Sequence, residues 1–272
     1  MGELDSVFEL FLRFGFFLII LVGLTILEIV RPLRKLQHPK TKRWFANFSV
    51  SLTNTIIVSL IFPVIGVTGA LFAMDRGWGL FNIINLSPII TIPIYLLLFD
   101  LTIYLQHRLF HSVGPLWRLH RMHHSDMDYD LSTGIRFHPL SIIVSSFIKL
   151  GLIFLLGPAA IAVLISEILL NGTSMFNHSN WDLPKGVDSN LRRILVTPNR
   201  HRIHHSIKTS EASCNFGFNF PWWDKLFGTY KAQPDLGHRG MEVGIHHCRD
   251  ERAIKYFSLI REPFREDDRE LK

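Results

Sequence analysis

Residues 101–124 read LTIYLQHRLFHSVGPLWRLHRMHH, and in this stretch an apolar segment runs into two closely spaced groups of histidines. A third group, HRIHH, follows at residues 201–205. On an α-helix His107 and His111 lie about 40° apart, and the three imidazoles of each H-x-x-H-H group fall within an arc of about 100°. Each of these histidine boxes (residues 107–111, 120–124 and 201–205) therefore presents its side chains in one direction, as residues that share a metal ion must.

The number of histidines in the boxes indicates more than one metal ion. Eight of the 14 histidines in the chain fall in the boxes. Histidines scattered over the surface and the core would not cluster in this way. One metal ion takes about four to six ligands, so eight converging imidazoles suit two ions. The Glu-x-x-His pairs of soluble di-iron carboxylate proteins are absent from the boxes. Imidazole ligands suit iron, zinc, copper or nickel, and the ligands alone do not choose among these metals.

Composition and long apolar segments predict an integral membrane protein. Hydrophobic residues make up 48% of the chain. Three apolar segments long enough to cross a bilayer lie at residues 8–30, 46–74 and 88–106, and the third leads directly into the first box. The first segment is preceded by Glu3 and Asp5 and is followed by no A-x-A cleavage site, so we expect a retained anchor rather than a signal peptide.

A fourth apolar segment, residues 141–171, contains Gly157-Pro158 near its middle. Each leg would have about 16 residues and span roughly 24 Å, which is short for a full crossing. We therefore expect a re-entrant or thin helical hairpin, which returns the chain so that the third box can join the first two. The expected fold is an all-α integral membrane protein with transmembrane helices, this hairpin, and a cytoplasmic helical cap that carries a histidine-rich di-metal site.

Basic residues predict the orientation of the chain. Six of them lie between residues 31 and 43, whereas the loop after the second expected span holds only Asp75 and Arg76. The positive-inside rule then places the boxes and the residues from 178 onward in the cytoplasm and the N-terminus outside. The net charge of +6 fits this pattern and contact with anionic lipids, and nothing resembles a nucleic-acid module. We expect an anchor region with its basic loop (1–94), a histidine-box domain (95–230) and a cytoplasmic tail (231–272).

Several residues outside the boxes have more than one interpretation. His178 lies where the hairpin returns to the side of the boxes and is a candidate ligand. His138 precedes a proline and is a ligand, a hydrogen-bond partner of a ligand, or a residue that stabilises the turn. We interpret Asp126, Asp128 and Asp130 as a solvated loop rather than as partners of ligand imidazoles. The remaining histidines are expected at the surface: His38, His238, His246 and His247.

Three further features concern the membrane and the redox compartment. Arg13 and Glu28 lie near the ends of the first span, where we expect their side chains to reach the bilayer surface. Cys214 and Cys248 both fall in the part expected in the cytoplasm, so no disulfide is predicted. The aromatic residues between 221 and 230 suit an interfacial belt or a lid over the site, and the belt is the simpler interpretation.

The order of these motifs resembles the fatty acid hydroxylase / sterol desaturase superfamily. The resemblance covers residues 95–230 and rests on the boxes and their surroundings, LWRLHRMHHSD, RFHP, FNHSN, TPNRHRIHHS and NFGFNFPWWDKLFGTY. It implies a membrane enzyme with a non-haem di-iron centre that uses O2 and supplied electrons to hydroxylate or desaturate lipids. The metal ligands that it implies are His107, His111, His120, His123, His124, His178, His201, His204 and His205, with His138 as a possible additional ligand.

The chain departs from the family pattern at three positions. Some members have a further histidine where this chain has Ser174, which puts a ten-ligand set in doubt. Many have acidic residues at the positions of Ser141 and Asn199, where a change could affect geometry or substrate. No flavin, nicotinamide or haem-attachment motif is present, so we expect electrons from a separate donor, a ferredoxin or a cytochrome b5-type protein. The lipid remains open among sterols, fatty acyl chains, ether lipids, sphingoid bases and carotenoids.

Three other classes of function fit the sequence less well. A membrane zinc hydrolase is the main alternative, but zinc sites use three or four ligands with a carboxylate base nearby. A bis-histidine haem carrier would place single histidines far apart within its spans. A metal transporter would place polar ligands near the middle of its spans, which the three complete spans do not show.

Overall fold

The computed structural model describes residues 3–84 and 86–266 of the chain. Within these residues the fold is all-helical, as expected, and the extended segments form only isolated β-bridges. The helices and 3-10 helices of the described part are α1 (Glu3–Val30), α2 (Lys40–Ile61), α3 (Val67–Asp75), α4 (Leu80–Ile84), α5 (Pro88–Ser112), α6 (Gly114–His124), η1 (Leu131–Ile135), α7 (Pro139–Leu156), α8 (Ala160–Asn177), α9 (Lys185–Leu191), α10 (Pro198–His204), α11 (Thr209–Ala212), α12 (Trp222–Leu226), α13 (Gly237–Gly240), η2 (Glu251–Ile254), α14 (Tyr256–Ile260) and η3 (Glu262–Phe264).

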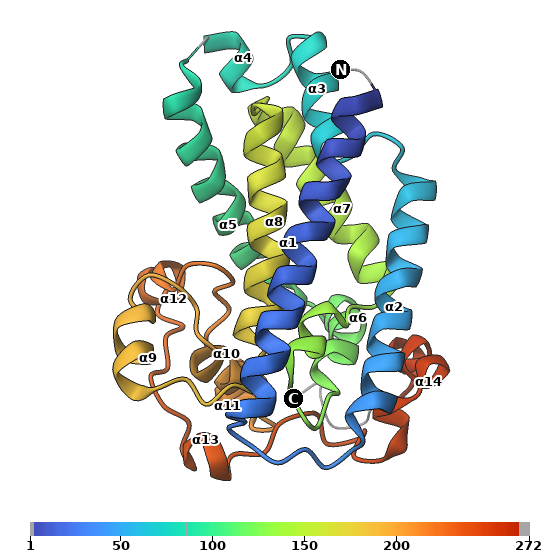
Figure 1. The fold of residues 1–272 in the computed structure, drawn as a ribbon, viewed down its shortest axis with the longest axis vertical. Coiled ribbons are helices and arrows are strands. Elements are labelled where there is room, and N and C mark those ends of the chain that lie inside the picture. The colour runs from blue at the N-terminus through green and yellow to red at the C-terminus, as the bar shows by residue number, and fades with distance from the viewer. Residues whose placement is uncertain (1–2, 85, 267–272) are drawn as a thin grey trace.

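Five helices of the described part are long and apolar enough to cross a membrane, namely α1 from Val7 onward, α2, α5, α7 and α8. α1 packs against α8 and α2 packs against α7. The short helices α9 to α14 gather at one end of this bundle, and α3 and α4 lie at the other end (Figure 1). The expected cap is therefore present, and its location in the cytoplasm stays a prediction.

The second expected span, residues 46–74, is wrong as a single segment. α2 begins earlier, at Lys40, and ends at Ile61, while α3 is a separate helix. Pro63 has no backbone N–H, and Gly66 has a φ of 61°, in the left-handed region that favours glycine. These two residues end the first helix and turn the chain, so that α2 alone is the candidate span.

The expected hairpin is confirmed, although its legs are longer than the sequence suggested. α7 and α8 have 18 residues each, which corresponds to about 27 Å, and both are candidate spans. Gly157 ends α7 with a φ of 62°. A Cβ at this position would lie 2.3 Å from the backbone oxygen of Trp78, so the turn requires glycine here.

A buried ion cluster joins α2 to the loop after the second histidine box. Arg43 has no exposed surface. Its guanidinium donates to Asp126 and to Asp130, both at 2.7 Å, and lies 3.7 Å from Asp128. All three aspartates are buried, so their interpretation as a solvated loop is wrong. Arg43 belongs to the basic stretch that suggested a lipid-facing loop, yet it is a core residue.

Glu28 also points into the protein rather than toward the bilayer surface. Its side chain is buried and accepts hydrogen bonds from the backbone N–H of Leu131 at 2.8 Å and of Asn180 at 2.9 Å. Lys40 donates to the same carboxylate at 2.8 Å. The expectation that Glu28 snorkels is therefore wrong, and the residue instead connects the end of α1 to the cap.

The described part of the expected tail packs back onto the membrane helices and the boxes. Leu259 of α14 lies in one apolar cluster with Val50 of α2 and Met122 of α6. Arg118 of α6 donates to the backbone oxygen of Pro263 at 2.8 Å. Both cysteines are free, as predicted. Residues 267–272 of this segment lie outside the described part of the chain.

Candidate metal centre and its cavity

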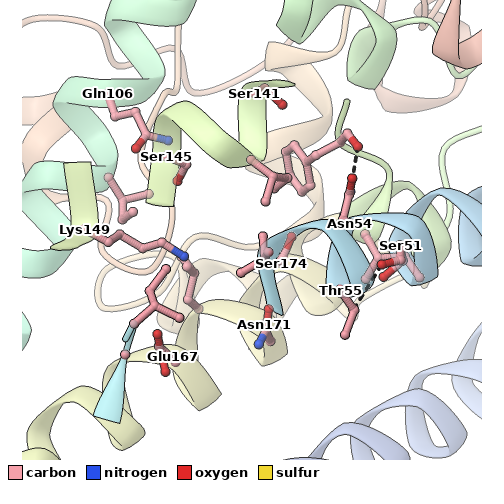
Figure 2. Close-up of a pocket in the computed structure, with 18 of the residues that line it drawn as sticks. Ser51, Asn54, Thr55, Gln106, Ser141, Ser145, Lys149, Glu167, Asn171 and Ser174 are labelled. Carbon is pink, nitrogen blue, oxygen red and sulfur yellow. Dashed lines mark hydrogen bonds between the residues drawn. The ribbon is translucent and has the colours of Figure 1, made fainter. Parts of the chain in front are cut away.

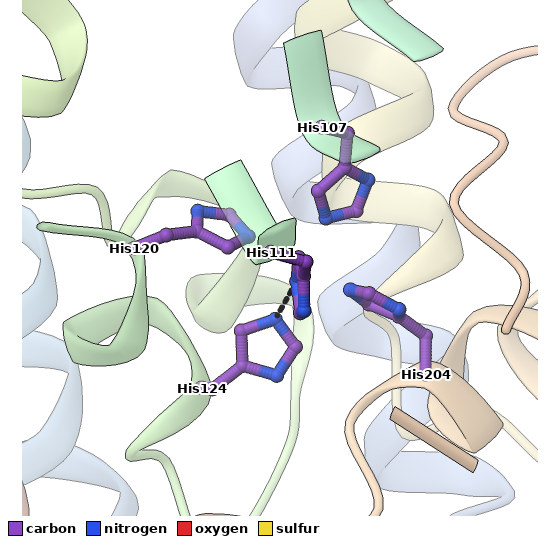
Figure 3. A group of neighbouring side chains, drawn as sticks. All are labelled: His107, His111, His120, His124 and His204. Carbon is purple, nitrogen blue, oxygen red and sulfur yellow. Dashed lines mark hydrogen bonds between the residues drawn. The ribbon is translucent and has the colours of Figure 1, made fainter. Parts of the chain in front are cut away.

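The structure brings together the nine histidines that the sequence singled out, and it divides them into two groups. The first group consists of His107, His111, His120, His124 and His204 (Figure 3). The second group consists of His123, His178, His201 and His205. Within each group the candidate ligand atoms all lie within 4.8 Å of one another, so each group can surround one ion.

Each H-x-x-H-H box serves both groups. His123 belongs to the second group and its neighbour His124 to the first, and His204 and His205 divide in the same way. Successive side chains on a helix diverge by about 100°, so two adjacent histidines at the end of a helix turn toward different partners. The last turns of α6 and α10 therefore hold the two groups side by side. His178, which directly follows α8, completes the second group from the hairpin.

Backbone carbonyls fix the tautomer of four rings. The Nδ1 atoms of these rings lie 2.7 to 3.2 Å from backbone oxygens, His107 from Phe216, His123 from Arg136, His178 from Ser174 and His204 from Cys214. A carbonyl oxygen only accepts, so each of these Nδ1 atoms carries the hydrogen and donates it. The lone pair is then on Nε2, which is the arrangement that protein acceptors impose on metal-binding imidazoles.

These lone pairs converge in a way that suits cations. His178 Nε2 lies 3.1 Å from His123 Nε2 and 3.1 Å from His205 Nε2. Since His123 and His178 both carry their hydrogen on Nδ1, neither donates across the gap and two lone pairs face each other. The Nε2 atoms of four other rings are buried without a hydrogen-bond partner in the described part of the chain, those of His107, His120, His201 and His204. A metal ion in each group would give all of these atoms a partner.

The electrostatic environment keeps the histidines in the form that binds metals. Burial lowers the pKa of His178 to about 3. Burial also lowers the pKa values of His123 and His204 well below their ordinary value, and neighbouring imidazoles disfavour a further positive charge. The rings are consequently neutral at physiological pH, and neutral imidazole is the ligand form.

Two buried carboxylates hold the loop that follows the third box. Asp224 accepts from the backbone N–H of Phe216 at 2.8 Å and of Gly217 at 2.9 Å. These bonds position the Phe216 carbonyl, which in turn orients the His107 ring. Asp100 accepts from the indole N–H of Trp223 at 2.9 Å. Burial raises the pKa of Asp224, against the effect of the nearby guanidinium of Arg200. Asp100 was not predicted as a site residue, although a carboxylate inside an apolar span is itself a signal.

Aromatic rings shield the centre. Phe137 stacks on His123 with ring centroids 4.4 Å apart and an interplanar angle of 14°. Phe216 lies 5.2 Å from the rings of His111 and His204. These side chains occupy positions next to the imidazoles from which water would otherwise reach the metals.

His138 lies outside both groups. Its Nδ1 accepts from the backbone N–H of Leu140 at 3.2 Å and so caps the start of α7, while its Nε2 donates to the backbone oxygen of Ile260 at 3.1 Å. This geometry matches the turn-stabilising interpretation. Among the histidines expected at the surface, His246 is exposed, whereas His38 and His247 contact buried carboxylates.

A cavity of about 710 Å³ leads from the centre into the helix bundle. At one end it is lined by His107, His120 and His123, so it reaches both histidine groups. Its walls come mainly from α2, α5, α7 and α8, and many of the side chains that face it are polar (Figure 2). The polar residues of the wall are Ser51, Asn54, Thr55, Ser59, Gln106, Ser141, Ser145, Asn171 and Ser174.

The far end of the cavity carries charged residues. Arg13 does not snorkel as expected but donates to Glu9 at 2.8 Å and to Glu167 at 2.7 Å. Lys149 lines the same region. Lys149 and Glu167 were not predicted as site residues, although charged residues within apolar segments mark functional sites in membrane proteins.

Comparisons with known proteins agree on one family. The family model described as fatty acid hydroxylase matches residues 92–229. Human alkylglycerol monooxygenase is 31% identical over 177 residues, which is 64% of this chain and 38% of that protein. Ornithine lipid hydroxylase OlsE of Rhizobium tropici is 34% identical over 155 residues, with 53% and 44% covered. Cholesterol 25-hydroxylase of Rattus norvegicus is 27% identical over 158 residues, with 58% and 51% covered.

The match therefore spans about half or less of the length of these relatives. No solved structure matches the chain.

Proposed function

The chain belongs to the fatty acid hydroxylase family, and on this premise we propose that it is an integral membrane oxidoreductase that hydroxylates or desaturates a membrane lipid at the expense of O2. The observation that carries the proposal is the cavity that joins both histidine groups to the interior of an apolar helix bundle. The relatives are named for alkylglycerol, ornithine lipid and cholesterol, all of which are lipids. A lipid is therefore the proposed substrate class.

The proposed cofactor is a pair of iron ions, one in each histidine group. The nine histidines, His107, His111, His120, His123, His124, His178, His201, His204 and His205, are the proposed ligands. All-imidazole ligands are compatible with iron. Iron bound here would supply the activation of O2 and the oxidation of an unactivated C–H bond, which no side chain achieves alone.

The side chains of this protein would position the reactants and exclude water. The carbonyls that fix the Nδ1 hydrogens orient the ligand rings before any metal binds. Phe137 and Phe216 cover the imidazoles. The cavity is lined mainly by α2, α5, α7 and α8, which are all candidate membrane spans, so a lipid bound in it would place one carbon beside His107, His120 and His123.

The alternative of a zinc hydrolase lacks support from the cavity. Such an enzyme needs a carboxylate base beside its metal-bound water. Among the described residues that line the cavity, the carboxylates are Glu9 and Glu167, and both are bonded to Arg13. Glu167 lies 11 residues before His178 on α8, which is roughly 16 Å along the helix. No carboxylate of the described lining is therefore beside the histidines.

Electrons would come from a separate protein, a ferredoxin or a cytochrome b5-type donor. We place its docking face on the cap that carries α9 to α14, and the positive-inside rule places this cap in the cytoplasm. The loops of the cap lie next to the histidines, because the Phe216 and Cys214 carbonyls contact ligand rings directly.

The proposal is tested by following lipid products in membranes that contain the iron-loaded protein, a reducing system and isotopically labelled O2. The expected result is a lipid that gains labelled oxygen or loses a pair of hydrogens, both with the wild-type chain and with His246→Ala, which alters an exposed histidine outside both groups. His123→Ala should abolish the product. A product that forms without O2, or at full yield in His123→Ala, would contradict the proposal.

A further inference from the structure

The end of the cavity away from the histidines carries charged side chains from α1, α7 and α8. We propose that Lys149, Arg13 and Glu167 bind the headgroup of an amphiphilic lipid, and that this headgroup carries an anionic oxygen together with a hydrogen-bond donor. The headgroup would thus lie inside the helix bundle rather than at the membrane surface. The inference rests on the proposed function only in placing the reacting carbon at the histidine end of the same cavity.

The fold maintains a charge cluster inside the bundle of candidate membrane helices. Arg13 on α1 bonds both Glu9 on its own helix and Glu167 on α8, at 2.8 and 2.7 Å. Gly66 gives the Glu167 carboxylate its space, because a Cβ at Gly66 would lie 2.9 Å from its Oε1. Charged residues within a bilayer are unfavourable and persist where they face a partner or a polar cavity. Here they line the cavity that reaches the metal centre.

Lys149 has no partner of its own among the described residues. This residue projects from α7 into the cavity, on the side where Glu167 and Asn171 also project (Figure 2). Arg13 already occupies both nearby carboxylates. Within the described residues the Lys149 ammonium has neither a hydrogen bond nor an ion pair, so it can donate to an anionic oxygen of a ligand.

Two buried amide oxygens of the cavity wall also lack a hydrogen-bond donor in the described part of the chain. Asn54 donates through its Nδ2 to the backbone oxygen of Phe137 at 2.8 Å, which fixes the amide and leaves its Oδ1 buried and unpaired in the described part of the chain. Gln106 Oε1 is buried and unpaired in the same sense. Both residues line the cavity. These two acceptors lie nearer the histidines than Lys149 does, because Phe137 stacks on His123 and Gln106 precedes His107. An alkyl chain alone would leave the acceptors and the ammonium without partners, whereas a lipid with a polar headgroup at one end and a further polar group along its length would satisfy them.

Charge balance selects the kind of headgroup. The charged residues of the described lining other than histidine are two cations and two carboxylates, so the site does not favour a ligand of large net charge. Lys149 offers donors, while Glu167 and the amide of Asn171 beside it offer acceptors (Figure 2). A headgroup that has both an anionic oxygen and O–H or N–H donors complements this arrangement, as phosphoethanolamine and phosphoglycerol do.

The positions of the residues also define the direction of the lipid. Lys149 lies eight residues beyond Ser141 on α7, or roughly 12 Å toward the end of the bundle away from the cap. Glu167 is similarly about 16 Å from His178 along α8. The headgroup would therefore lie well away from the metals, and the carbon that reacts would be in the chain rather than next to the headgroup.

Binding of lipids to the purified full-length protein tests this inference without any turnover. Native mass spectrometry would compare four single-chain lipids of equal chain length: lysophosphatidylethanolamine, lysophosphatidylglycerol, monoacylglycerol and a fatty acid methyl ester. We expect the two phospholipids to bind most tightly and the methyl ester to bind least. Lys149→Met should weaken phospholipid binding by about tenfold or more, which is the effect of losing one charge-assisted hydrogen bond.

Two further variants keep the test decisive. Lys149→Arg retains the charge and should bind phospholipids within about threefold of the wild type, since a guanidinium also bonds anionic oxygens. Lys208→Met removes an exposed lysine of the cap and should leave binding unchanged. Equal binding of all four lipids, or unchanged binding in Lys149→Met, would overturn the inference while leaving the oxygenase proposal untouched. Tight, Lys149-dependent phospholipid binding by a protein without oxygenase activity would instead refute only the proposed function.

Discussion

Replacing Arg43 by methionine should destabilise the protein by about 3–5 kcal/mol, the usual effect of removing one partner from a buried ion pair. The change leaves Asp126, Asp128 and Asp130 without their shared cation, and these residues are only 1%, 4% and 0% exposed. Burial by itself would raise the pKa of Asp126, but the charges of Arg43 and Arg136 hold it below its usual range. The variant therefore has to bury three carboxylates that have lost the cation they share.

The lower end of this range is the more realistic one, since other groups still contact the carboxylates. Thr133 donates to Asp126 at 2.7 Å, and Arg136 lies 3.9 Å from it. A loss of about 3 kcal/mol corresponds to a fall in Tm of roughly 6–12 °C for a protein of this size. Thermal unfolding in detergent, followed by tryptophan fluorescence, measures this shift. Metal content should fall in parallel, because the aspartate loop directly follows the second histidine box.

Arg31→Met is the matched control from the same basic stretch. The Arg31 side chain is 54% exposed and lies 3.6 Å from Asp182, and an exposed pair of this kind contributes about 0–1 kcal/mol. If Arg43→Met lowered Tm no more than Arg31→Met does, the buried cluster would not stabilise the fold and the reasoning would be refuted.

Three further changes probe the centre and its supports. Asp224→Ala should destabilise the protein by about 3–5 kcal/mol and lower its metal content, because two N–H groups of the loop lose their acceptor. Metal analysis checks this, with Asp235→Ala, which removes an exposed carboxylate, as the control. His138→Ala should keep its metals and lose about 1 kcal/mol of stability as a helix cap, and loss of metal would make His138 a ligand. The Tm of the metal-free protein should fall as pH drops below about 6.5. The reason is that His178, with its pKa lowered to about 3, takes up protons less readily in the folded than in the unfolded protein. A Tm that does not change with pH would contradict this.

The histidine centre illustrates what periodicity can and cannot predict. Helical spacing within each box indicated that its rings share a direction, and the rings do converge. The division of His123 and His124 between the two groups was not predicted, because treating each box as a single direction neglects the angle of about 100° between neighbours. The sequence does indicate the break in the second expected span, because Pro63 and Gly66 are both residues that favour turns.

Charged residues were the hardest to place. The positive-inside rule counts basic residues near the membrane, so it could not distinguish exposed Arg31 from buried Arg43. The partners of Arg43 lie more than 80 residues further along the chain, and only the tertiary fold brings them together. Lys149 and Glu167 had a local signal, because each is a charge in an apolar segment. Their shared cavity depends on where α7 and α8, the two legs of the hairpin, lie in the helix bundle. The spacing of residues along the sequence does not determine this.

The most direct test of the central proposal is the metal content of the purified protein, with Mössbauer spectroscopy to identify iron. One variant from each histidine group should be compared with the wild type, His204→Ala from the first and His178→Ala from the second, and His246→Ala provides the control. We expect about two iron ions per wild-type and control chain, one for each group of imidazoles, and loss of iron in both group variants. One zinc ion per chain, or unchanged metal in both group variants, would contradict it.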